Sequence, residues 1–243
     1  MTTGGVTEEQ GDKLSVLAVG ATADIFIVDD ERVLRRYRDQ HDASAEAALL
    51  AHVVAHGFPA PAVYSCDGPE LVIERLHGPT LLQALASGEF RLPDGVEILA
   101  DLHRRLHAVP PPAGTPDGDV VIHLNLDPGN VVLSESHGPA LVDWGKATTG
   151  SRDLDLAMTA IILAEVAVDS GGDYSRAARA MLASFLSVAG GNPLAALDEA
   201  GRIRLQDPVM LAGERMLLAP ASALVRRYAP DIISGSTSRP ASL

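Results

Sequence analysis

The chain has 243 residues, enough for one large domain or two lobes with a substantial buried core. Its 19 basic and 32 acidic residues give a net charge of −13, which repels phosphate backbones and argues against a nucleic-acid-binding protein. The longest apolar run, residues 156–168, contains Glu165 and is too short to cross a bilayer. The single cysteine, Cys66, excludes an intrachain disulfide, and the polar, acidic first residues do not resemble a secretory signal, so we expect a cytoplasmic protein.

The first third of the sequence predicts a small lobe rich in strands. Short apolar runs separated by turn residues are predicted as strands at five places: 14–19, 25–28, 32–37, 62–66 and 70–75. Gly20 lies at the first turn. A helix is predicted over residues 45–56, with Asp42 at its start and Gly57 as its stop. Together these elements predict an N-terminal lobe over residues 13–76.

The rest of the sequence is mainly helical in pattern. Helices are predicted at six places: 79–87, 94–108, 154–168, 174–188, 193–200 and 207–228. Between the second and third of these helices, residues 121–143 are predicted to form a strand, a polar loop and a second strand. The second lobe is predicted to span residues 77–230, and disordered or flexible tails are predicted at 1–12 and 231–243. Strands followed by helices indicate an α+β fold with two lobes, and a ligand is expected between them.

Polar residues are dense in the loop between the two strands, residues 123–130, which we name the central loop. Its polar members are His123, Asn125, Asp127 and Asn130. Burying such groups without partners costs several kcal/mol, so a loop like this usually serves chemistry. A hairpin over residues 131–142 would bring Asn130 close to Asp143. An amide oxygen and a carboxylate held there suit Mg²⁺, which most often carries the phosphates of a nucleotide.

At these residues the chain resembles a known family. HLNLDPGN followed by LVDWG is similar in spacing to the catalytic and metal-binding loops of aminoglycoside phosphotransferases and choline-kinase-like small-molecule kinases, distant relatives of the protein kinases. The resemblance implies a two-lobed protein-kinase-like fold that uses ATP and Mg²⁺. It also implies that Asn130 and Asp143 bind the metal ions and that His123 braces the central loop. Asp155, in GSRDLDLA, would support the backbone of that loop.

The resemblance extends over the predicted N-terminal lobe. AVGATADIFIV would be the hairpin that covers the nucleotide, with Gly20 at its turn. VLRRYR would be the third strand, and Glu46 the acid of the helix that follows. LVIERLHGPTL, with Glu74 near its middle, resembles the hinge that receives adenine. The C-terminal helices are where this family builds its acceptor pocket.

The third strand departs from the usual pattern, because relatives often carry a lysine there to hold the nucleotide phosphates. The chain has 17 arginines and two lysines, and neither Lys13 nor Lys146 lies on this strand. Alternation along the strand sends Arg35 and Arg36 to opposite faces. Arg35 aligns best with the lysine and is predicted to hold phosphates with Glu46 as its partner. The other interpretation is an exposed arginine on an edge strand.

The central loop also departs from the pattern, because Asn125 stands where the family has its catalytic aspartate. An amide cannot take a proton at neutral pH, although its oxygen accepts a hydrogen bond. General-base help is worth about 10²–10⁴-fold, whereas phosphoryl transfer depends mainly on positioning and charge neutralisation. A protein with Asn125 can therefore be slow without being inactive. Asp127 either supplies the missing carboxylate or is a solvated loop acid.

The sequence thus predicts an enzyme that moves the γ-phosphoryl group of ATP to a hydroxyl of a small molecule: an aminoglycoside, an amino sugar, a sugar or an amino alcohol. The rival hypothesis is a pseudokinase that lost catalysis at Asn125 and binds nucleotide or a protein partner. Four acids of the C-terminal half either meet a cationic acceptor or are ordinary surface acids: Glu165, Asp169, Asp173 and Glu199. The sequence leaves the oligomeric state open.

Two histidines, His103 and His107, lie one helical turn apart in HRRLH. The spacing is that of a zinc-protease helix, but arginine replaces the glutamate of HExxH. The sequence suggests no third ligand, so we do not expect zinc at this pair.

Overall fold

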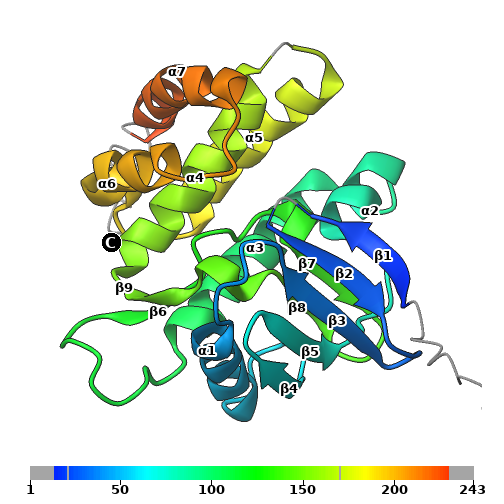
Figure 1. Ribbon diagram of the computed structural model, residues 1–243. Helices are drawn as coiled ribbons and strands as arrows, with labels where there is room; N and C mark the ends of the chain where they lie inside the picture. The colour runs from blue at the N-terminus through cyan, green and yellow to red at the C-terminus, as the bar shows by residue number, and fades with distance from the viewer. Residues whose placement is uncertain (1–13, 21, 170, 230–243) are drawn as a thin grey trace, which may run out of the picture.

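The structure is a computed structural model that describes residues 14–20, 22–169 and 171–229 (Figure 1). A small lobe with an antiparallel sheet and a larger lobe of helices lie side by side in it. The predicted α+β arrangement with two lobes is confirmed. The tails predicted at 1–12 and 231–243 lie outside the described residues.

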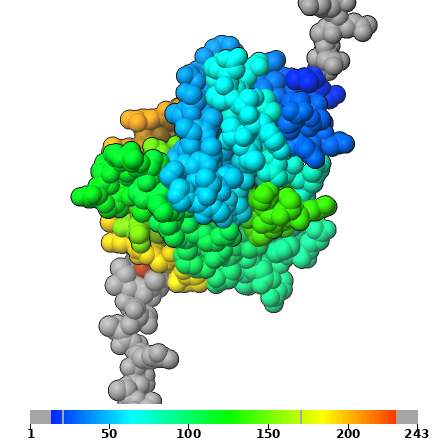
Figure 2. Space-filling model, turned by 90° about the horizontal axis from the view of Figure 1, so that it is seen from below, coloured from blue at the N-terminus to red at the C-terminus, as the bar shows by residue number. Residues whose placement is uncertain are grey.

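The small lobe is a five-stranded antiparallel sheet with one helix. Its strands, in chain order, are β1 (Ser15–Val19), β2 (Ala23–Ile27), β3 (Arg32–Tyr37), β4 (Val63–Asp67) and β5 (Glu70–Glu74). The order across the sheet is β1-β2-β3-β5-β4, so β3 lies at its centre. The helix α1 (Ser44–Ala55) buries Leu50 and Val53 in the core that continues into the helical lobe. Figure 2 shows this face, where α1 and its neighbouring strands lie against green residues of the helical lobe.

The large lobe is built around one buried helix. Its helices are α2 (Leu81–Ser87), α3 (Leu92–His107), α4 (Arg152–Val168), α5 (Asp173–Val188), α6 (Pro193–Leu205) and α7 (Ala212–Tyr228). Twelve of the 17 residues of α4 are buried, because α5, α6 and α7 pack around it. An apolar surface on all sides of a helix is typical of such a central position. Among the described residues, no helix has the length and hydropathy needed to cross a membrane.

Two small sheets lie between the lobes. In one, β6 (Val120–Ile122) pairs with β9 (Thr148–Gly150); in the other, β7 (Val131–Ser134) pairs with β8 (Gly138–Leu141). Short 3₁₀ turns, η1 (Pro128–Asn130) and η2 (Trp144–Lys146), precede β7 and β9. The hairpin of β7 and β8 agrees with the prediction. The strand β9 was not predicted, because three residues, TTG, carry no periodicity of their own and become a strand only by pairing with β6.

Two helix boundaries differ from the prediction. Helix α6 continues beyond residue 200, because Ile203 packs on the core and Arg204 finds a partner on α4. Helix α7 begins at Ala212 rather than near residue 207. The Asp207 side chain accepts a hydrogen bond from the Val209 amide at 3.2 Å, which forms a turn at this point instead of a helix.

Candidate active site

The hairpin places Asn130 and Asp143 at one end, as predicted. The strands β7 and β8 pair Val131 with Leu141, and the amide of Val142 donates to the carbonyl of Asn130 at 2.9 Å. Asp143 follows directly, with a φ of 66° in the left-handed region. A residue other than glycine rarely adopts this conformation, and it persists where the surrounding structure holds it, often at functional sites.

The Asp143 carboxylate joins the two lobes. Arg35 on β3 donates from Nη2 to Oδ1 at 2.6 Å, and Asn125 donates from Nδ2 to Oδ2 at 2.8 Å. Burial alone would raise the pKa of Asp143, but the charge and hydrogen bond of Arg35 outweigh burial and hold that pKa below its usual value. Asp143 is therefore a carboxylate at neutral pH, with a protein cation beside it.

Arg35 and Arg36 point to opposite faces of the sheet, as predicted. Arg35 is 8 % exposed on the central strand, whereas Arg36 is exposed and bonds Glu70 at 2.7 Å. The interpretation of Arg35 as an exposed arginine on an edge strand is wrong, because β3 lies between β2 and β5.

Arg35 also contacts the acid predicted as its partner. Its Nη1 lies 3.5 Å from Oε1 of Glu46 on α1, and the Tyr37 hydroxyl donates to the other oxygen of Glu46. Burial by itself lowers the pKa of Arg35, but the charges of Asp143 and Glu46 outweigh burial and raise it. The Arg35 Nε is buried without a hydrogen-bond partner among the described residues. Arg35 is thus a permanent cation between two acids, and its Nε–H remains free to donate a hydrogen bond.

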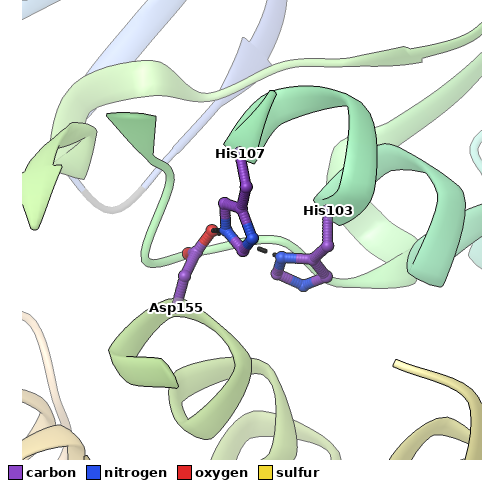
Figure 3. Close-up of side chains that lie close together, drawn as sticks. All are labelled: His103, His107 and Asp155. Atoms are coloured by element: carbon purple, nitrogen blue, oxygen red, sulfur yellow. Dashed lines mark hydrogen bonds and ion pairs between the residues drawn. The ribbon is translucent and has the colours of Figure 1, made fainter. Parts of the chain in front are cut away.

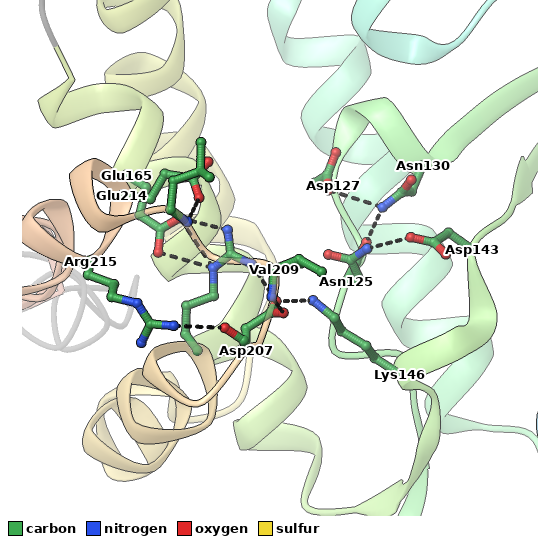
Figure 4. A network of polar contacts seen from close by, with 12 residues as sticks. Asn125, Asp127, Asn130, Asp143, Lys146, Glu165, Asp207, Val209, Glu214 and Arg215 are labelled. Atoms are coloured by element: carbon green, nitrogen blue, oxygen red, sulfur yellow. Dashed lines mark hydrogen bonds and ion pairs between the residues drawn. The ribbon is translucent and has the colours of Figure 1, made fainter. Parts of the chain in front are cut away.

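The central loop is held by its own side chains (Figure 4). Asn130 donates from Nδ2 to the Asn125 carbonyl at 2.9 Å and to Asp127 Oδ2 at 3.2 Å, which turns its amide oxygen away from the loop. Asp127 Oδ1 accepts from the Gly129 amide at 2.6 Å and so caps η1. Burial raises the pKa of Asp127. Neither interpretation from the sequence anticipated this capping role.

Asp155, in the first turn of α4, supports the backbone of the central loop, as predicted. Its Oδ1 accepts from the amides of His123 at 3.1 Å and Leu124 at 2.7 Å. Its Oδ2 accepts from His107 Nε2 at 2.9 Å and lies 3.3 Å from His103 Nδ1 (Figure 3). Burial alone would raise the pKa of Asp155, but the two histidines outweigh burial and hold it far below its usual value.

Asp155 lies where a third metal ligand beside His103 and His107 would be needed, which the sequence did not suggest. One ligand atom each from His103, His107 and Asp155 lies within 4.8 Å of the others, a spacing that could hold a metal ion. However, Asp155 is fully engaged, and His103 Nε2 lies 3.0 Å from Thr159 Oγ1, which itself donates to the Leu126 carbonyl at 2.7 Å. We interpret the cluster as a hydrogen-bonded support of the central loop.

His123 braces the loop by packing. Its ring is fully buried and meets the Trp144 ring edge-on at 5.0 Å between centroids. Burial lowers the pKa of His123 to about 4, so its ring is neutral at neutral pH. Trp144 is itself fixed by a hydrogen bond from Nε1 to the Leu141 carbonyl at 2.9 Å. Trp144 is part of the motif LVDWG, but its packing against His123 was not predicted from the sequence.

Gly20 and Glu74, the remaining predicted residues, both lie in the small lobe, Gly20 between β1 and β2 and Glu74 at the end of β5. The Gly20 amide donates to the Ala23 carbonyl at 2.9 Å, and a Cβ on Gly20 would lie 2.8 Å from that oxygen, so the turn requires glycine. Glu74 accepts from the Ala62 amide at 3.1 Å and from His137 Nε2 at 2.8 Å. Since His137 lies in the β7–β8 turn, the Glu74 side chain ties the end of β5 to the large lobe.

A second polar cluster, not predicted from the sequence, faces the central loop from α6 and η2 (Figure 4). Arg204 bonds Glu165 at 2.9 Å and Asp207 at 3.3 Å, and Lys146 also donates to Asp207. The signal in the sequence was Glu165 itself, because an acid inside an apolar helix needs a partner. The partner lies 39 residues away, beyond the reach of local pattern reading.

Three of the four acids considered for a cationic acceptor have now been placed. Glu165 is buried against Arg204. Asp173 is exposed and pairs with Arg176, and Glu199 is exposed on α6. The one buried acid of the three is therefore already neutralised by the protein.

Comparisons with known proteins agree with the fold described above. The model of a phosphotransferase enzyme family, named APH, matches residues 13–120. The predicted resemblance is confirmed. The aminoglycoside phosphotransferase APH(4)-Ia has a TM-score of 0.61 at 15 % identity, with 90 % of this chain and 93 % of that chain covered.

A choline/ethanolamine kinase family protein from Mesorhizobium loti has a TM-score of 0.58 at 14 % identity, and 90 % of each chain is covered. At these identities the two structures show a shared fold. No curated protein matches the chain in sequence. The chain therefore shares the fold of small-molecule phosphotransferases over most of its length.

Proposed function

We propose that the chain transfers the γ-phosphoryl group of ATP to a hydroxyl of a small molecule, with Mg²⁺ as cofactor. The observation that carries this proposal is the meeting of Arg35, Asp143 and Asn125 between the lobes, with Arg35 and Asn125 on the two oxygens of one carboxylate. A cation from the sheet and an acid from the loops converge there, which is what a site for Mg²⁺ and phosphates requires.

The donors at this place fit Mg²⁺. Asp143 is ionised, and the amide oxygen of Asn130 is turned away from the central loop. Carboxylate and amide oxygens are the hard ligands that Mg²⁺ prefers, and we assign Asn130 and Asp143 as those that would hold it. The bound ion neutralises phosphate charge. Arg35 would bind the phosphates, with Glu46 keeping its guanidinium in place.

Asn125 would position the acceptor rather than deprotonate it. Its Nδ2 donates to Asp143, which leaves its oxygen to accept a hydrogen bond from the acceptor hydroxyl. His123 and Asp155 would fix the backbone of the central loop, and Asp127 would hold Gly129 and Asn130 in place through hydrogen bonds. This division of work favours positioning over proton transfer, which is what phosphoryl transfer mainly needs.

Neighbours of the same fold support ATP as the phosphate donor. A thermostable mutant of APH(4)-Ia was crystallised with AMP-PNP and hygromycin B, at a TM-score of 0.60 and 15 % identity. APH(2'')-Ib was crystallised with ADP. The proposal also includes a cytoplasmic location, which rests on the single cysteine of the chain.

Calorimetric titration with ATP, with and without Mg²⁺, tests the nucleotide site. We expect Mg²⁺-dependent binding by the unmodified chain and loss of that dependence in Asp143→Ala. Asp67→Ala, which removes an exposed acid of β4, is the control and is expected to bind like the unmodified chain. Undiminished Mg²⁺-dependent binding by Asp143→Ala would remove Asp143 from the site.

A second function, a pseudokinase that only binds nucleotide, is favoured by one observation. Both oxygens of Asp143 already have protein partners, and one of these, Asn125, stands where the family has its base. Asn125→Asp separates the two functions. Phosphoryl transfer by the unmodified chain that rises in this variant identifies an enzyme. Transfer that appears only in the variant, or is absent from both proteins across a panel of hydroxyl acceptors, identifies a binding module.

A further inference from the structure

A cavity of about 580 Å³ lies between α2, α3, α4 and α5, and the central loop forms part of its wall. Asp127, Pro128 and Gly129 are the loop residues that line it. The volume lies within the roughly 300–1,000 Å³ of ordinary small-molecule pockets. Because Asp127 bonds Asn130 at 3.2 Å, the cavity lies one hydrogen bond away from the proposed metal ligands.

The cavity wall is mainly apolar. Side chains from the helices and from the α2–α3 connection line it, among them Leu82, Leu85, Phe90, Ile162, Val166 and Met181. Leu82, Val166 and Tyr174 are exposed although they are large and carry apolar surface. Grouped exposed side chains of this kind usually mark a binding site.

The acids at the cavity offer little to a polycation. Asp127 already accepts hydrogen bonds from Gly129 and Asn130, and Asp173 pairs with Arg176 at the exposed start of α5. Glu165 does not line the cavity, and its carboxylate already bonds Arg204. A polycationic molecule would lose its hydration in this cavity without gaining ion pairs in return.

We propose that the acceptor is an alcohol with a mainly apolar body, bound in this cavity with its hydroxyl at the central loop. This inference rests on the proposed function and names its substrate class. The acceptor oxygen bonds to the γ-phosphorus of ATP, and the bond from that phosphorus to the β–γ bridging oxygen breaks. ADP leaves with the electron pair, and the hydroxyl proton passes to solvent.

A binding experiment with the neutral dye Nile red tests the cavity directly. We expect the dye to bind with increased fluorescence, and farnesol, a neutral apolar alcohol, to displace it. Gentamicin at the same concentration should not displace it. Absence of dye binding, or displacement by gentamicin as effective as that by farnesol, overturns the inference.

Two variants on one helix locate the binding. Ala177 on α5 is exposed and lines the cavity, so Ala177→Trp fills the space without disturbing the core. Ala180, also exposed on α5, is outside the lining. We expect Ala177→Trp to weaken dye and farnesol binding at least tenfold and Ala180→Trp to leave both within twofold. Equal effects of the two variants would place the dye elsewhere and overturn the inference.

Titration of the same proteins with Mg²⁺ and ATP separates this inference from the proposed function. Retained nucleotide binding together with failed dye binding rejects the apolar acceptor alone. Failed nucleotide binding in the unmodified chain rejects the proposed function, whatever the dye does.

Discussion

Asp143 and Asp155 are two carboxylates of the same lobe, and both have a pKa below the usual value. Their surroundings differ. The Asp155 side chain is 0 % exposed and meets two backbone amides and two histidines. The Asp143 side chain is 38 % exposed and meets one guanidinium and one amide. The Asp155 carboxylate is enclosed and supports the fold. The Asp143 carboxylate is exposed enough to exchange partners, which a binding site must do.

Removing Asp155 should have the largest effect on stability. Asp155→Ala leaves two buried amides and His107 without their acceptor and removes the carboxylate 3.3 Å from His103. Breaking a buried charged group away from its partners costs about 3–5 kcal/mol. Urea unfolding measures the loss. Asp153→Ala, in the same turn of α4, removes one exposed hydrogen bond to the Asn192 amide and should cost about 1 kcal/mol. Equal losses would mean that Asp155 is not a special support.

Restoring an acid beside Asp143 should have the largest effect on chemistry. Asn125→Asp supplies a general base and is expected to raise the rate of phosphoryl transfer by about 10²–10⁴-fold. It also replaces a donor 2.8 Å from Asp143 with a second carboxylate, so Mg²⁺ should be needed at lower concentration. Steady-state kinetics at several Mg²⁺ concentrations measure both effects. A lower rate in the variant would contradict the assigned role of Asn125.

His123 should give the fold a pH dependence of its own. Its pKa is about 4 in the fold and about 6.5 in the unfolded chain, so between these values the unfolded chain binds more protons. Stability is therefore full above pH 6.5 and falls as the pH drops towards 4, by on the order of 2–3 kcal/mol. His123→Leu should remove this part of the slope, and His56→Gln, at an exposed position, should not. Unfolding free energies measured from pH 7 to 4 provide the test.

Arg35 should have the smallest but most specific effect. Arg35→Met is expected to weaken Mg²⁺-ATP binding about 10- to 100-fold, because a hydrogen bond to a charged group is worth about 1.5–3 kcal/mol. Arg36→Met changes the neighbouring residue on the exposed face and should shift affinity less than twofold. Calorimetry distinguishes them. Similar losses in both variants would indicate a general charge effect and remove Arg35 from the site.

Features that depend on residues close together in the sequence were predicted correctly. The alternation of VLRRYR correctly separated Arg35 from Arg36, and the hairpin correctly brought Asn130 beside Asp143. The pairing of Arg35 with Glu46 followed from the resemblance and is also seen.

Contacts between distant segments were not predictable in the same way. The partner of Glu165 lies 39 residues away, and His103 reaches Asp155 across 52 residues of sequence. In each case the side chain's role depends on a neighbour brought in by tertiary packing, about which composition and periodicity carry no information.

Under the proposed function, the contact between Arg35 and Asp143 would make nucleotide binding an exchange of counter-ions. In the free protein the guanidinium neutralises the carboxylate, whereas in a complex it would neutralise phosphate and leave the carboxylate to the metal ion. The measured affinity is then the difference between two sets of ion pairs rather than the sum of new ones. Changes that loosen the resting pair can thus tighten binding, so the affinity of this site can be raised as well as lowered by substitutions that never touch the nucleotide.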